Sequence, residues 1–188
     1  TYEWVREPSD ISKADKLLFP GVGSFASAMD ALHAKGYVEP LRAYIQSGKP
    51  LMGICVGMQV LFEGSDESPG VQGRGSVTAR DGRVATQDAF GRKAVPHMGW
   101  SLANGVEWDG CADQRHELAK SYGMHDANPS HYYFVHSYRV AWDANVAEWA
   151  LTTTQYGNEI FVSSIQHANV FATQFHPEKS GQAGLDLL

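Results

Sequence analysis

The sequence is poor in cysteine, in long apolar runs and in positive charge. Cys55 and Cys111 are its only cysteines, too few for a disulfide framework, so we expect a reducing compartment, the cytoplasm, or a plastid in a plant. Its apolar runs span only a few residues, far short of a membrane span. The 15 Lys and Arg are outnumbered by 21 Asp and Glu without any basic stretch, which gives nucleic-acid binding little support.

A signal peptide is also missing, since the chain begins at Thr1 without an initiator methionine or a following apolar segment. We therefore interpret it as a piece of a longer protein. With 188 residues, 43% of them hydrophobic and 19% charged, it is long enough for one domain with its own core and too apolar for extended disorder.

The first third of the chain alternates between strand-like and helix-like patterns. Ser24 is a suitable cap for a helix that Gly36 ends. The expected elements, in order, are a strand at 16–19, helices at 25–35 and 38–45, a strand at 51–55 and a helix at 56–63. This alternation favours an α/β architecture with parallel strands.

The rest of the chain is richer in strand-like runs. We expect a loop at 64–75, hairpins within 76–110 at the Asp-Gly pairs 81–82 and 109–110, and weak helical character at 111–128. Four further strands are predicted at 132–135, 149–154, 160–162 and 170–173, before a helical pattern that runs to Leu188. The predicted fold is α/β, with an open, mixed, largely parallel central sheet, flanking helices and added antiparallel strands.

Gly53-Ile54-Cys55-Val56-Gly57 lies between a predicted strand and a predicted helix. Gly-x-nucleophile-x-Gly is the pattern of a nucleophile elbow, whose sharp turn projects the central side chain and excludes side chains two residues away. A helix N-terminus favours the thiolate of Cys55, and the Val56 amide would face a developing oxyanion. A lone cysteine in an apolar run is more often structural, so only a partner base can decide.

His176-Pro177-Glu178 follows the strand at 170–173 and offers such a base. A histidine there can lie at the sheet edge of the elbow, and the glutamate can accept from its other ring nitrogen, as in a catalytic triad. A third strand-end loop, Pro20-Gly21-Val22-Gly23, can bring an amide to the same place because glycine permits close backbone approach. Taken alone, that loop is equally well a tight turn.

These three pieces, in this order, resemble the class I (triad) glutamine amidotransferases. Within that family, the chain is similar to the glutaminase part of imidazole glycerol phosphate synthases of histidine biosynthesis. The motifs that carry the closer resemblance span nearly the whole chain: Pro-Gly-Val-Gly (20–23), Gly-Ile-Cys-Val-Gly-Met-Gln (53–59), Val-Pro-His-Met-Gly-Trp (95–100), Tyr-Phe-Val-His-Ser-Tyr (133–138) and Ala-Thr-Gln-Phe-His-Pro-Glu-Lys-Ser (172–180).

The resemblance implies a flavodoxin-like fold and a role for each matching residue. Cys55 would attack the glutamine carboxamide, His176 would transfer the proton and Glu178 would hold His176. The amides of Val22 and Val56 would stabilise the oxyanion, the former after a flip of its loop. The residues implied to hold the α-amino and carboxylate groups of glutamine are Gly23, Gln59, Glu67, Ser137 and Tyr138. Those implied to face the partner are Trp100, Tyr133 and Lys179.

That partner would be a (β/α)8 cyclase, either a separate subunit or a fused domain, which receives the ammonia and makes imidazole glycerol phosphate and an aminoimidazole carboxamide ribotide. The resemblance implies no cofactor, and the histidines show no spacing typical of metal ligands. Members of the family open with a strand, a Gly-rich turn and a helix, so we expect the domain at 1–188 to lack that unit. Ser101 stands where Asn is usual, which predicts an altered partner contact.

Simpler interpretations stay open for several of these residues. Gln59 could be a solvated helix residue, and Trp100 could be a core aromatic. Tyr133 and Tyr138 lie in strands, where aromatics are common. Ser137 could serve simply to satisfy backbone hydrogen-bonding groups. At the level of the whole chain, the alternatives are another class I glutamine amidotransferase, an α/β thiol hydrolase acting on an ester or lactone, and a binding module without catalysis.

Overall fold

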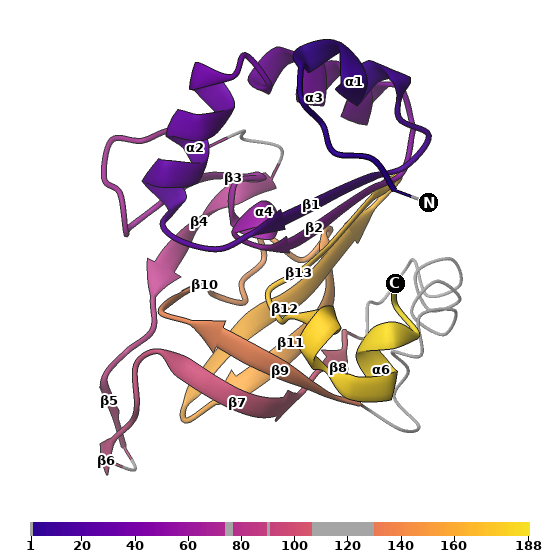
Figure 1. Cartoon of the computed structure of the whole chain (residues 1–188). Coiled ribbons are helices and arrows are strands. Elements are labelled where there is room, and N and C mark those ends of the chain that lie inside the picture. The colour runs from indigo at the N-terminus through magenta and orange to yellow at the C-terminus, as the bar shows by residue number, and fades with distance from the viewer. Residues whose placement is uncertain (1, 74–76, 90, 107–129) are drawn as a thin grey trace.

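The computed structural model describes residues 2–73, 77–89, 91–106 and 130–188. Its centre is a six-stranded mixed sheet (Figure 1). In spatial order its strands are β1 (Leu17–Gly21), β2 (Leu51–Cys55), β13 (Val170–Thr173), β12 (Glu159–His167), β11 (Ala150–Tyr156) and β8 (Asn104–Gly105). The predicted class, a mixed α/β sheet with flanking helices, is confirmed.

The sheet is less parallel than the sequence predicts. β1, β2 and β13 are parallel to one another, whereas the pairings of β13 with β12, β12 with β11 and β11 with β8 are antiparallel. The reason lies in the connections. Residues 157–158 join β11 to β12, and residues 168–169 join β12 to β13, and such short turns permit only antiparallel neighbours.

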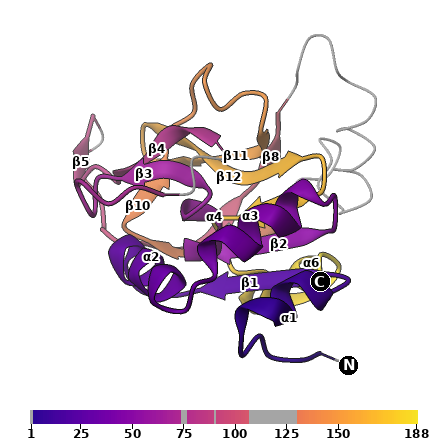
Figure 2. The same ribbon diagram turned by 90° about the horizontal axis from the view of Figure 1, so that it is seen from above.

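Three helices lie on one side of this sheet, above β1 and β2 in Figure 1, and Figure 2 shows them from above. They are α1 (Pro8–Lys13), α2 (Phe25–Ala34) and α3 (Val38–Gln46). As predicted, Ser24 caps α2 by accepting a hydrogen bond from the Ser27 amide, and Gly36 follows its end at φ +66°. The sequence analysis missed α1, whose start is fixed by Asp10 accepting from the backbone amides that precede it.

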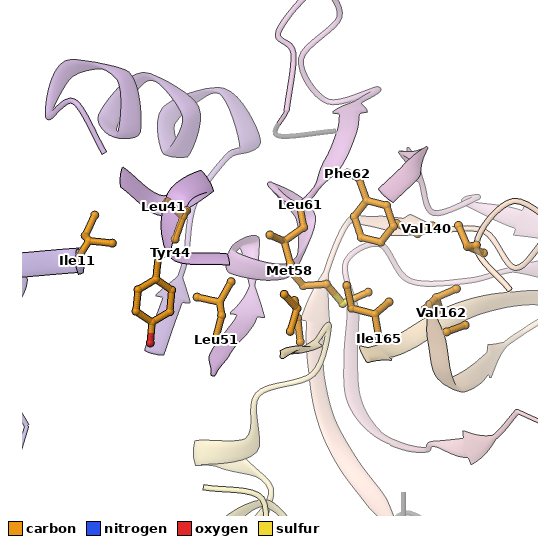
Figure 3. Close-up of a cluster of buried hydrophobic side chains, with 14 residues drawn as sticks. Ile11, Leu41, Tyr44, Leu51, Met58, Leu61, Phe62, Val140, Val162 and Ile165 are labelled. Atoms are coloured by element: carbon orange, nitrogen blue, oxygen red, sulfur yellow. The ribbon is translucent and has the colours of Figure 1, made fainter. Parts of the chain in front are cut away.

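A buried cluster joins α1 and α3 to the sheet (Figure 3). Side chains alternate along β13, so Val170 and Ala172 belong to this cluster while Phe171 belongs to another. Met58 and Leu61, which follow the elbow cysteine in the chain, are fully buried in it. The cluster therefore anchors the segment that carries Cys55. The labelled side chains are Ile11, Leu41, Tyr44, Leu51, Met58, Leu61, Phe62, Val140, Val162 and Ile165.

A two-stranded antiparallel ribbon and a short helix pack against the other face of the sheet, in the lower half of Figure 1. They are β7 (His97–Leu102), β9 (His131–His136) and α6 (Gly181–Leu185). Tyr132 and Phe134 of β9 pack in a second buried cluster with Phe161, Phe171 and Phe175. This aromatic packing attaches the ribbon to the sheet.

Two local predictions are wrong. The helix expected at 56–63 is only α4 (Val56–Gln59), and the chain continues as β3 (Phe62–Ser65). β3 pairs with β4 (Val77–Arg83), which pairs with β10 (Tyr138–Val140), so strand pairing overrides the local helical pattern. The Asp-Gly pair at 81–82 lies inside β4 rather than in a turn. A hairpin does join β5 (Gln87–Asp88) to β6 (Gly91–Arg92).

Two expectations fall outside the described residues, the Asp-Gly turn at 109–110 and the weak helix at 111–128, and Cys111 lies outside them as well. In the part of the chain that the structure describes, no helix is long and apolar enough to cross a membrane. The chain from the end of β13 continues through a 3-10 helix, η1 (Pro177–Lys179), into α6, which bears out the helical pattern predicted there.

Gly57 offers a sharp test of this packing. A Cβ placed there would lie 2.0 Å from the carbonyl oxygen of Phe19, so Gly57→Ala should lower the free energy of unfolding by about 3 kcal/mol or more. Gly70→Ala is the matched control, since its Cβ would meet nothing within 4 Å. Its only expected cost is the backbone strain of an alanine at a φ of +90°, about 1–2 kcal/mol. Urea unfolding measures both, and an equal loss would contradict the assigned clash.

Candidate active site

Cys55 sits on a strained turn between β2 and α4. Its φ and ψ are 54° and −109°, a conformation that side chains rarely adopt and that costs about 1–3 kcal/mol. A Cβ at Gly53 would lie 2.7 Å from the carbonyl oxygen of Gly57, which explains why both flanking positions are glycine. The predicted elbow is therefore present. Because α4 has only four residues, it offers the amides of a first turn rather than a long macrodipole.

The Pro-Gly-Val-Gly loop lies directly beside this elbow. β1 is parallel to β2, and Gly21 is paired with Cys55. A Cβ at Gly21 would lie 2.9 Å from the Cβ of Val56, so only glycine allows the two strand ends to approach this closely. Val22 follows and is 85% exposed, and Gly23 has a φ of +106°.

His176 reaches the same edge from β13, which is the other parallel neighbour of β2. Its Nδ1 lies 2.7 Å from Oε1 of Glu178, and its backbone amide donates to the carbonyl of Tyr133 at 2.9 Å. Because Nδ1 is engaged by the carboxylate, Nε2 is the nitrogen left for proton transfer. The imidazole is almost fully buried, whereas Glu178 is exposed.

Most of the predicted site residues line one pocket of about 340 Å³. Glu178 supports it from behind His176. The predicted residues that line it are Val22, Gly23, Cys55, Val56, Gln59, Glu67, Ser137, Tyr138, His176 and Lys179. The sequence analysis missed Pro96, Val135 and His136, which line it as well. A thiol beside an imidazole that is oriented by a carboxylate can attack a carbonyl carbon and form a thioester.

A buried amide network surrounds the cysteine. Nε2 of Gln59 donates to the carbonyl of Tyr138 and to Oε1 of Gln174, each at 3.3 Å. Nε2 of Gln174 in turn lies 3.7 Å from Sγ of Cys55. Gln59 is buried, so it is not a solvated helix residue. Since both of its N–H donors serve protein acceptors, Oε1 is the group that it can offer to a ligand.

Glu67 has a structural task in addition to its place in the pocket. Its Oε2 accepts a hydrogen bond of 2.8 Å from the Phe25 amide, the first of α2. A carboxylate at that position satisfies an amide that the helix itself leaves without a partner. Glu67 therefore fixes the loop after β3 against the loop that carries Gly23.

Trp100, Tyr133 and Lys179 form one outer patch. Trp100 and Tyr133 are paired across β7 and β9 with ring centroids 6.2 Å apart, and Nζ of Lys179 lies 6.0 Å from the Tyr133 centroid. Trp100 is 54% exposed, so it is not a core residue. Ser101 points the opposite way, with Oγ 3.0 Å from Nε2 of His97, and the altered partner contact expected at this position stays a prediction.

His97 and His136 form a buried pair beneath this patch. His97 Nδ1 lies 3.1 Å from His136 Nε2. His97 is only 2% exposed and His136 only 5%. Burial, together with the positive charge of Lys93, lowers the pKa of His97 to about 4. Burial, with His97 beside it, lowers the pKa of His136 to about 3. Both imidazoles are therefore neutral near pH 7.

Acidification should destabilise the fold through this pair. The folded-state pKa values of both histidines lie below the ordinary 6.5. Between about pH 6.5 and pH 4 the unfolded chain therefore binds more protons than the folded chain, and the free energy of unfolding falls as the pH drops through this range. From pH 7 to pH 5 the free energy of unfolding should fall by about 1–2 kcal/mol for each histidine. Urea unfolding at both pH values should show a smaller fall in His97→Gln, while His33→Gln, an exposed control on α2, should keep the full fall.

The comparisons with known proteins agree with this geometry. The sequence matches the family "Glutamine amidotransferase class-I" over residues 3–186. The imidazole glycerol phosphate synthase hisHF of Emericella nidulans is 44% identical over 189 residues, which are 99% of this chain and 32% of that protein. The corresponding synthase subunit HisH of Methanothermobacter thermautotrophicus is 42% identical over 182 residues, 97% of this chain and 80% of that protein. The chain thus spans about a third of the hisHF relatives.

Solved structures share the fold at low sequence identity. One described as a glutamine amidotransferase superposes with a TM-score of 0.63 at 18% identity and covers 96% of this chain and 80% of its own. The glutaminase domain of Trypanosoma brucei CTPS gives 0.61 at 17% identity, over 96% of this chain and 72% of its own. With a family match that spans almost the whole sequence, this chain belongs to the class-I glutamine amidotransferases.

Proposed function

We propose that this chain hydrolyses glutamine and supplies the ammonia to a (β/α)8 cyclase, which makes imidazole glycerol phosphate and an aminoimidazole carboxamide ribotide in histidine biosynthesis. The observation that carries the proposal is the meeting of Cys55, His176 and an acceptor-bearing Gln59 in one pocket, with Glu178 behind the imidazole. The HisH and hisHF names of its relatives support the choice of this pathway among class-I enzymes.

The proposed chemistry uses Cys55, His176 and Glu178 as a catalytic triad. Cys55 Sγ adds to the carboxamide carbon of glutamine while Nε2 of His176 takes the thiol proton. The Glu178 carboxylate, 2.7 Å from Nδ1, stabilises the imidazolium that results. His176 then returns the proton to the leaving nitrogen, the C–N bond of the tetrahedral intermediate breaks, and ammonia departs to leave a thioester on Cys55. Water, deprotonated by the same imidazole, hydrolyses the thioester to glutamate and restores the thiol.

The amides of Val22 and Val56 are assigned to the oxyanion of the tetrahedral intermediate. Both residues line the pocket, and they follow two paired strand ends, those of Gly21 and Cys55. The Val56 amide belongs to the first turn of α4, which leaves it without a helical partner. We assign to the loop of Val22 a change of orientation on activation, which turns its amide towards the oxyanion. Gly23, with a φ of +106°, gives the backbone of this loop the conformational freedom for that change.

The recognition of glutamine is assigned to the opposite wall of the pocket. Gln59 would accept from the α-ammonium group through Oε1, because its N–H groups serve Tyr138 and Gln174. Glu67 adds a negative charge for the same ammonium group, and Gly23, Ser137 and Tyr138 surround the α-carboxylate. These groups would contact the α-ammonium and α-carboxylate groups of glutamine and not the scissile amide. They would therefore bind the substrate equally well in the ground state and in the transition state.

The outer patch of Trp100, Tyr133 and Lys179 is assigned to the cyclase. Aromatic rings with a cation beside them are typical of an interface anchor, and Trp100 is half exposed on the face that adjoins the pocket rim at Lys179. Docking there would cover the pocket and let ammonia pass without protonation in bulk water.

The nucleophile is tested with diazo-oxo-norleucine, an electrophilic glutamine analogue. Mass spectrometry of the protein should find the adduct on Cys55. Cys55→Ala should lose both the label and at least about a thousandfold in glutamine hydrolysis, while Cys111→Ala, the matched control at the other cysteine, should keep both. Labelling that survives in Cys55→Ala would remove Cys55 from the mechanism.

The partner is tested by measuring glutamate release with and without a (β/α)8 cyclase subunit and its nucleotide ligand. Hydrolysis should rise strongly only when both are present. Trp100→Ala should weaken the apparent binding of the cyclase by about 30-fold, as expected for an anchor worth about 2 kcal/mol. Ile160→Ala, at a similarly exposed apolar residue on β12, should not. High hydrolysis without the cyclase would instead favour an independent thiol hydrolase.

A further inference from the structure

We propose that His136 is a positioning residue for the glutamine site, in which its Nδ1–H holds the carbonyl of Tyr138 and His97 holds His136 in that tautomer. The inference rests on the proposed function, because the site that it positions is the one assigned to glutamine. It concerns two histidines that take no part in the triad, one on β7 and one on β9.

The hydrogen bonds fix the proton on each ring. His136 Nδ1 lies 2.8 Å from the Tyr138 carbonyl, which can only accept, so Nδ1 carries the proton. In a neutral ring, Nε2 is then an acceptor and requires the His97 Nδ1 proton across 3.1 Å. His97 Nε2 is left to accept from Oγ of Ser101 at 3.0 Å. The chain of donors therefore runs in one direction, from Ser101 through both rings to the carbonyl of Tyr138.

The Tyr138 carbonyl is where this chain of hydrogen bonds meets the pocket. It accepts from His136 and from Nε2 of Gln59, so it joins two pocket residues at one atom. The neighbouring carbonyl of Ser137 accepts from the Val84 amide at 2.8 Å. Both carbonyls of the bend between β9 and β10 are thus held, and the bend presents Ser137 and Tyr138 to the pocket in one arrangement.

His136 lines the same pocket as His176 but cannot replace it as a base. Both of its ring nitrogens are engaged by protein groups, whereas within the described residues the His176 ring is engaged through Nδ1. The charged or titratable groups that face His136 are His97, His176 and Arg139, and each disfavours its protonation. A neutral His136 beside His176 leaves the triad histidine to carry the positive charge alone.

Gln59 keeps a second anchor at Gln174, and Gln174 reaches Cys55 without His136. Loss of the His136 donor should therefore disturb the wall that holds the substrate more than the nucleophile. Contacts that are equal in the bound and reacting states act on KM rather than kcat. The expected signature of positioning is thus a raised KM with a nearly constant kcat.

Two near-isosteric variants separate the two nitrogens of His136. Asn places an N–H close to the Nδ1 position, so His136→Asn retains the donor to Tyr138. Gln reaches the Nε2 position, so His136→Gln can accept from His97 but loses that donor. With the cyclase and its ligand present, His136→Gln should raise the KM for glutamine by about tenfold or more, with kcat within about threefold, and His136→Asn should stay within about threefold of the unchanged protein in both.

The proposal is overturned if the two variants show the same KM, or if His136→Gln lowers kcat without changing KM. Absence of glutamine hydrolysis in the unchanged protein would instead defeat the proposed function, so the two failures are distinguishable. Should His136→Gln not fold, the unchanged protein still decides. ¹⁵N NMR of its imidazoles should show His136 and His97 protonated at Nδ1 at pH 7, and a proton on Nε2 of His136 would overturn the proposal.

Discussion

The close contact between the backbone of β1 and the turn after β2 is the constraint on which the site depends. The carbonyl oxygen of Phe19 occupies the space that a side chain at Gly57 would need, and Cys55 is held at a positive φ between two such glycines. That conformation persists because Met58 and Leu61 are buried immediately after it. The core thus stabilises a strained conformation of Cys55 that the local chain would not adopt by itself.

Parallel pairing extends this constraint to the other two parts of the site. β1 and β13 flank β2, so their carboxyl ends deliver the Val22 loop and His176 to the edge where Cys55 stands. The antiparallel strands β12 and β11 contribute no residue to the lining of the pocket. Their role is to support the β7–β9 ribbon, which returns across the sheet and closes the pocket with Val135, His136 and Ser137.

The sequence was sufficient to predict the elbow at Cys55 and the contact between His176 and Glu178, because glycines at fixed offsets and a His-x-Glu after a strand express short-range sterics and chemistry. It was insufficient for Gln174, His97 and His136, whose roles need strands far apart in the chain to be paired in a known register. His97 and His136 are 39 positions apart yet face each other. The length of α4 was unpredictable for the same reason, since pairing with β4 turns residues 62–65 into a strand.

The two-residue period of β7 gives its two faces different tasks. Met98, Trp100 and Leu102 are exposed, while His97 and Ser101 point inward towards the pocket network. Inserting or deleting a single residue in β7 would exchange these faces, and would place the His97 imidazole in solvent and turn Trp100 towards His136. Evolution can therefore substitute residues along this strand but cannot change its length by one, so the number of residues between Pro96 and Ala103 should be invariant among relatives.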